Sequence, residues 1–415
     1  MDKAADHSND SLRAFGLTRF RRAEKLAPHL NNSLNLKSKE HIVVSATPSQ
    51  TASGEERESW FMTFAWRRRN DHHDDVGSAY FLKLLLMTLL PALITGCGSF
   101  VAHRMIQAPN TYATWLAPSA RVLLSFDDKL LTNSPARFAE VGPPAARLRY
   151  RVVEPADYHL KVCSTNWLEH GEARSQFDFH AEMPQTNRWT AAPRGTVFLL
   201  HGYGLAEFSM VPWAWRLAEA GWRCVLVDLR GHGKSTGKTI TFGLTESRDL
   251  SQLLDVLTNQ GRFASPVAVM GESYGAALAL RWQTIDPRVA SVVAVAPYAV
   301  LSNAVMNICR DYAGLLPRFV IRAGLKELPA MLGVPGDELD TTTIVTRHPA
   351  TALFITATED EVIPPAEVRS LFAVALPGSE LIVVPGATHE TVPYRFAELV
   401  PPVLAWLDKN KPAPR

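Results

Sequence analysis

Between residues 196 and 407, short apolar segments alternate with amphipathic segments that have the length of ordinary helices. "TVFLL" at 196–200, "RCVLV" at 223–227, "VAVM" at 267–270 and "SVVAV" at 291–295 are apolar at successive positions. A strand that is apolar on both faces belongs in a parallel sheet covered by helices on both sides. The alternation therefore predicts an α/β fold with a mostly parallel central sheet.

The alternation is interrupted once, over residues 298–348, and then resumes. Mixed helical stretches such as "AVMNICRDYAGLLPRFVIRAGL" fill the interruption, and strands at 352–357 and 381–384 follow it. We interpret residues 145–297 and 349–410 as the α/β core and residues 298–348 as a helical cap inserted before a late strand. Residues 98–144, with scattered Pro, Asn and Ser, are expected to form a linker.

The first 75 residues are polar and lack sustained periodicity, so we expect them to be disordered or a spurious N-terminal extension. The cluster Asp71–His72–His73–Asp74–Asp75 is interpreted as a solvated charge run, because adjacent residues seldom converge on one metal ion. The composition of the whole chain is that of a globular protein, with 47% hydrophobic residues and a net charge of +2. Such a balance gives no electrostatic footprint for nucleic acid.

Residues 76–97 have the layout of an export signal. Lys83 precedes an apolar run from Leu84 to Ile94, and the small residues Thr95 and Gly96 lead to Cys97. The ending "ITGC" resembles a bacterial lipobox, and this resemblance implies acylation of Cys97. The run is shorter than the ~20 apolar residues of a membrane-spanning helix. An uncleaved signal anchor and a buried helix of a soluble protein are the alternatives.

Export signals begin at the N-terminus of a protein, yet about 75 residues precede this one. We therefore expect the true start to lie downstream, near Val76 or Met62. The mature chain would then begin at Cys97. The expected location is the bacterial cell envelope, as a membrane-anchored lipoprotein facing the periplasm; a cytoplasmic location is the alternative.

The pentapeptide "GESYG", residues 271–275, joins the strand at 267–270 to a helix rich in small residues. Gly271 and Gly275 allow the helix to pack close against the strand, as a tight strand-to-helix turn demands. Such a turn projects the Ser273 hydroxyl upward, where the helix N-terminus favours negative charge. Ser273 is the candidate nucleophile.

Two further candidates follow later strands in the order expected for a catalytic triad. Asp360 lies in "TATEDEV" and His389 lies in "PGATHET", each directly after a predicted strand. Imidazole has a suitable pKa for activating a hydroxyl, and a carboxylate orients that imidazole. His389 is the only histidine after His348, whereas Asp360 has acidic neighbours on both sides.

With "HGYG" at 201–204 and "DLRGHGKS" at 228–235, the chain resembles the α/β-hydrolase superfamily. The order of the motifs in this chain, with a cap before the strand that precedes Asp360, is similar to that of the monoacylglycerol-lipase-like and serine-aminopeptidase-like branches. The resemblance implies an oxyanion hole formed by the backbone N–H groups of Tyr203 and Tyr274. We expect His201 and His232 to be structural and not catalytic.

These patterns predict a serine hydrolase that cleaves carboxylic esters with small to medium acyl chains through an acyl-enzyme. A serine aminopeptidase or thioesterase on the same fold is one alternative, and a non-catalytic envelope scaffold is another. We expect a small-molecule ester substrate, a membrane tether through Cys97 or a signal anchor, and no metal or organic cofactor. The role of Glu272 is open, and apolar cap residues fit either an acyl pocket or the core of the cap.

Overall fold

The computed structural model describes residues 98–111, 122–169, 172–182, 189, 191–312 and 317–409. The predicted extension (1–75), the charge run at 71–75 and the signal segment (76–97), with its candidate lipid-attachment residue Cys97, lie outside the described residues. Among the residues that are described, no helix is both long and apolar enough to cross a membrane.

The central element is an eight-stranded sheet in the order β11-β10-β9-β8-β6-β7-β3-β2. The strands from β6 to β11 pair in parallel, whereas β3 and β2 extend one edge in antiparallel pairings. The bounds are β2 Arg137–Val141, β3 Ala146–Val153, β6 Thr196–Leu200, β7 Arg223–Val227, β8 Val267–Glu272, β9 Val289–Val295, β10 Ala352–Ala357 and β11 Glu380–Val384. The mostly parallel sheet predicted from the alternation and the α/β-hydrolase fold implied by the resemblance are both confirmed.

Helices cover both faces of this sheet, as its buried strands require. One face packs against α4 (Glu246–Asn259), α5 (Tyr274–Ile285) and α9 (Pro365–Val374). The other packs against α3 (Val211–Glu219) and α10 (Phe396–Lys409). The cores on the two faces include the fully buried Trp282 and Trp406, respectively.

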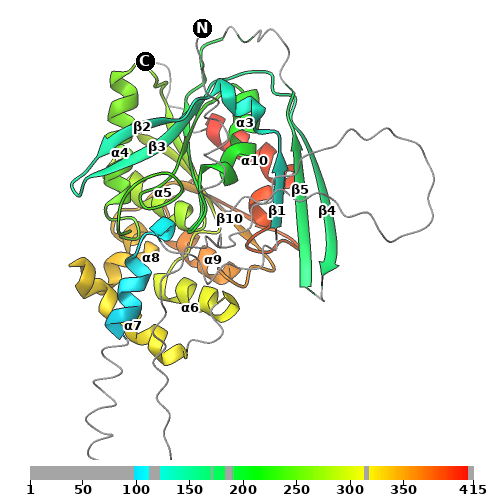
Figure 1. Cartoon of the computed structure of the whole chain (residues 1–415). Coiled ribbons are helices and arrows are strands. Elements are labelled where there is room, and N and C mark those ends of the chain that lie inside the picture. Colours follow the sequence, from blue (N-terminus) through cyan, green and yellow to red (C-terminus); the bar gives the residue numbers. More distant parts are fainter. Residues whose placement is uncertain are drawn as a thin grey trace, which may run out of the picture.

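Between β9 and β10 the chain leaves the sheet and forms α6 (Leu301–Tyr312), α7 (Arg318–Leu332), η4 (Gly336–Leu339) and α8 (Thr341–Arg347). These helices gather at one end of the molecule (Figure 1). Residues 98–106 are also helical and cross α7 closely, because a Cβ added to Gly324 would lie 2.6 Å from Val101 Cγ1.

The interpretation of residues 98–144 as a linker was wrong. Besides the helical residues 98–106, this stretch contains β1 (Val122–Phe126) and β2, which pairs with β3 at the edge of the central sheet. β1 pairs with β5 (Glu172–His180), which also pairs with β4 (Lys161–Glu169). This three-stranded sheet lies beside α10, and β4 and β5 form its outer hairpin (Figure 1).

Candidate active site

Ser273 sits on a strained turn between β8 and α5. Its φ of 51° is in the left-handed region, which a residue with a side chain rarely adopts. A Cβ on Gly271 would lie 2.2 Å from the carbonyl oxygen of Gly275, and one on Gly275 would lie 2.3 Å from that of Leu200. Glycine is therefore required on both sides of the serine for the helix to approach the sheet this closely.

The structure brings Ser273, His389 and Asp360 together in one chain of hydrogen bonds. Ser273 Oγ lies 3.0 Å from His389 Nε2, and His389 Nδ1 lies 2.8 Å from Asp360 Oδ2. The other carboxylate oxygen, Asp360 Oδ1, accepts a hydrogen bond from Ile363 N–H at 2.6 Å. Asp360 is buried, so its orientation is fixed from both sides. This arrangement suits proton transfer from the serine hydroxyl to the imidazole.

The environment of His389 favours the protonated imidazole. Burial disfavours the charged ring, but the charge and hydrogen bond of Asp360, together with the charges of Glu390 and Glu272, outweigh it and raise the pKa of His389 above its ordinary value. An imidazolium formed when the serine gives up its proton is thereby stabilised.

Glu272, whose role the sequence left open, directly precedes Ser273 and ends β8. Its Oε1 accepts hydrogen bonds from Gly202 N–H at 3.2 Å and from the Ser209 hydroxyl at 3.1 Å. The side chain is buried, and burial raises its pKa, against the effects of these two hydrogen bonds and of His389. The carboxylate thus fastens the "HGYG" loop after β6 to the strand that carries the serine.

The two predicted oxyanion donors lie on neighbouring segments. Tyr274 is the first residue of α5, so its N–H has no acceptor within the helix. Tyr203 lies next to Gly202, and its ring centroid is 6.2 Å from that of Tyr274. The loop and the helix start therefore converge beside Ser273.

His201 and His232 have structural partners instead of a place in the triad. His201 Nδ1 lies 2.8 Å from the Gly202 carbonyl oxygen, and its Nε2 accepts from Leu229 N–H at 3.0 Å. His232 Nδ1 lies 2.9 Å from the Arg230 carbonyl oxygen. Burial is the main cause that lowers the pKa of His201 to about 4 and that of His232 to about 3, so both rings are neutral at pH 7.

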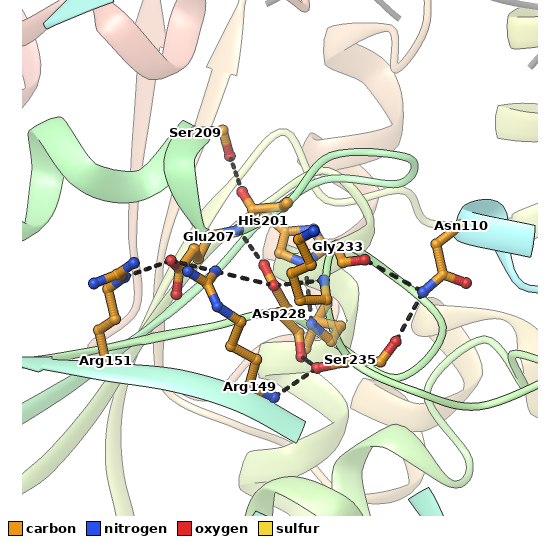
Figure 2. A network of polar contacts seen from close by, with 12 residues as sticks. Asn110, Arg149, Arg151, His201, Glu207, Ser209, Asp228, Gly233 and Ser235 are labelled. Carbon is orange, nitrogen blue, oxygen red and sulfur yellow. Dashed lines mark hydrogen bonds and ion pairs between the residues drawn. The ribbon is translucent and has the colours of Figure 1, made fainter. Parts of the chain in front are cut away.

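Behind the loop, two buried carboxylates and two half-buried arginines join three elements (Figure 2). Glu207, the first residue of η3 (Glu207–Met210), accepts from Arg149 at 2.5 Å and from Arg151 at 2.7 Å, both on β3. Asp228, directly after β7, accepts from the backbone N–H groups of Glu207 and Lys234. Since η3 also carries Ser209, this network supports the segment that Glu272 holds.

The sequence analysis did not identify Arg149, Arg151, Glu207 or Ser209. Arg149 lies 58 residues before Glu207, and no local spacing connects them. The only available signal was charged residues beside apolar strand segments. No group of three or more potential metal ligands occurs within the described residues.

Comparison with known proteins agrees with this architecture. Residues 191–350 match the family model described as "Serine aminopeptidase, S33". An 85-residue stretch is 31% identical to the uncharacterized protein YqkD of Bacillus subtilis (strain 168). That stretch is 20% of this chain and spans 28% of the length of YqkD.

Solved structures with a similar fold include two esterases. The Pyrococcus furiosus esterase Pf2001 is 20% identical with a TM-score of 0.49, and the alignment covers 70% of this chain and 97% of the esterase. Acetyl xylan esterase 1 from Thermoanaerobacterium sp. is 18% identical with a TM-score of 0.43, over 66% of this chain and 83% of the other.

The sheet order, the serine on its glycine-flanked turn and the matched segment all point to one superfamily. The chain has the α/β-hydrolase fold and is similar over residues 191–350 to the S33 serine aminopeptidases.

Proposed function

We propose that this protein hydrolyses carboxylic esters with small to medium acyl chains, with Ser273 as nucleophile, His389 as general base and acid, and Asp360 as the residue that orients the imidazole. The observation that carries the proposal is the continuous hydrogen-bond chain from Ser273 Oγ through both ring nitrogens of His389 to Asp360. These are the three roles that nucleophilic acyl transfer requires.

In the first step, Ser273 Oγ attacks the ester carbonyl carbon while its proton passes to His389 Nε2. The tetrahedral intermediate carries its negative charge on the former carbonyl oxygen, which accepts from Tyr203 N–H and Tyr274 N–H. His389 then gives the proton to the departing alcohol, and the C–O bond to that alcohol breaks. Water, activated by His389, attacks the acyl-enzyme and releases the carboxylic acid and free Ser273.

We favour esters over peptides with a free amino terminus because a substrate ammonium group needs a negative counter-charge. Asp360 is engaged by His389, and Oε1 of the buried Glu272 accepts hydrogen bonds from Gly202 and Ser209. The family model described as serine aminopeptidase nevertheless supports an aminopeptidase as the second candidate.

A fluorophosphonate probe and two substrate series test the proposal. We expect the probe to label the purified protein and Ser273→Ala to remove the label, with p-nitrophenyl butyrate and octanoate cleaved far faster than aminoacyl arylamides. The opposite preference among substrates would establish the aminopeptidase. A well-folded wild-type protein that the probe does not label would indicate the non-catalytic scaffold.

We also propose that the protein is a lipoprotein of the bacterial cell envelope, acylated at Cys97 and facing the periplasm. The support is the order of cation, apolar run, small residues and cysteine in residues 83–97. Labelling of cells with a palmitate analogue should mark the wild-type protein and not Cys97→Ser. Equal labelling of both proteins, or of neither, would contradict this proposal.

A further inference from the structure

A cavity of about 540 Å³ lies between α6 and α7 of the cap and the start of α9. Its lining includes Arg318, Arg322 and Lys326 from α7 and Ser302, Asn303 and Asn307 from α6. The three cations are spaced four residues apart, so they share one face of α7. The volume falls in the range of about 300–1,000 Å³ that is usual for organic ligands.

The cations of this cavity differ in their pairing from the other arginines of the cap. Within the described part of the chain, Arg318, Arg322 and Lys326 form no ion pair, and all three are exposed. Other arginines of the same cap are paired, Arg310 with Glu361 and Arg347 with Asp337 and Glu338.

One carboxylate, Glu367, also lines the cavity, but it already has partners. Its Oε2 accepts from Ala299 N–H at 3.0 Å and from Val300 N–H at 3.4 Å. Three positive charges thus face one carboxylate that binds the backbone before α6. The hydroxyl of Ser302 and the amide of Asn303 add neutral hydrogen-bond donors to the same lining.

We propose that this cavity binds a phosphoryl group carried by an organic molecule. Two guanidinium groups and one ammonium group match the several oxygens and the charge of a phosphate ester. The cavity has room for the attached organic part, and Met306 and Leu325 supply apolar surface for it. A membrane phospholipid headgroup and a soluble phosphate ester share this chemistry.

The test uses full-length protein carrying Ser273→Ala, so that no ester probe is consumed. sn-Glycerol 3-phosphate is titrated calorimetrically, with glycerol as the uncharged counterpart. We expect binding of the phosphate ester alone, weakened about tenfold by Arg322→Gln and further by Arg318→Gln/Arg322→Gln. Arg369→Gln, which removes an exposed cation from α9 outside the cavity, is the matched control and should bind normally.

Vesicles of phosphatidylglycerol and of phosphatidylcholine distinguish the two sources. If phosphatidylglycerol vesicles bind the parent protein but not its Arg322→Gln variant, the ligand is a lipid headgroup. If glycerol 3-phosphate binds and the vesicles do not, the ligand is a soluble ester. Thermal unfolding of each variant verifies that it is folded. The proposal is overturned if no phosphoryl probe binds the parent, or if the cavity variants and Arg369→Gln bind equally.

Discussion

At the scale of single residues, the pKa of His389 links the geometry of the triad to a measurable pH profile. Only the neutral imidazole accepts the proton of Ser273, so kcat/KM should rise with pH through the pKa of the free enzyme. Because Asp360 raises that pKa, the midpoint of the rise should lie above the ordinary value of 6.5.

Replacing Asp360 with asparagine should reduce kcat/KM by about 10⁴-fold, because the imidazole loses its orientation and the stabilisation of its charge. The midpoint of the acid limb should also move to lower pH, since the carboxylate that raises the pKa is gone while burial still lowers it. A pH–rate profile of both proteins measures this shift. An unchanged midpoint would show that Asp360 does not govern the protonation of His389.

Glu272 should act by positioning the loop that carries Tyr203. Glu272→Ala removes the acceptor of Gly202 N–H, so we expect kcat to fall about ten- to hundredfold with a smaller change in KM. Glu272→Gln keeps a carbonyl oxygen at this place and should retain most of the activity. Ser209→Ala, which leaves the Gly202 contact intact, is the control. Equal losses in the Ala and Gln variants would argue against the positioning role.

At the scale of elements, η3 is held to β3 by Glu207 between two arginines. Their side chains are 17% and 16% exposed and that of Glu207 is 5% exposed. Removing the shared partner leaves Arg151 without its carboxylate and Arg149 with only its longer contact to Asp228 at 3.4 Å, so Glu207→Ala should lower the free energy of unfolding by about 3 kcal/mol.

Urea unfolding measures this loss, and the half-buried pair of Arg216 and Glu219 on α3 provides the comparison. Glu219→Ala should cost less than about 1 kcal/mol, since a pair near the surface contributes little. Similar losses in the two variants would mean that Glu207 and its two arginines contribute no more to the free energy of unfolding than a pair near the surface.

How far the elements could be predicted depended on their burial. β8 and β10 are buried at every position, and their uninterrupted apolar runs marked them within two residues of their observed ends. β2 is an edge strand whose residues alternate between exposed and buried, and five such residues among Pro and Asn resemble a loop. The partners of Glu272 lie 63 and 70 residues away, a proximity that only the folded chain creates.

At the scale of the whole molecule, the domain begins earlier than its catalytic core. Val101, Ala102, Ile106 and Ala108 are buried, and Ile240 N–H donates to the Ile106 carbonyl oxygen at 2.8 Å. A chain that starts at Asn110 should therefore unfold at a lower temperature than one that starts at Gly98, a difference that calorimetry can measure. Equal melting temperatures would show that residues 98–109 add no stability.

The close crossing of residues 98–106 over α7 has a mechanical consequence. At Gly324 the two segments lie too close for a side chain to fit between them, so residues 98–106 would have to move together with α7. The beginning of the described domain and the cap therefore form one packed unit.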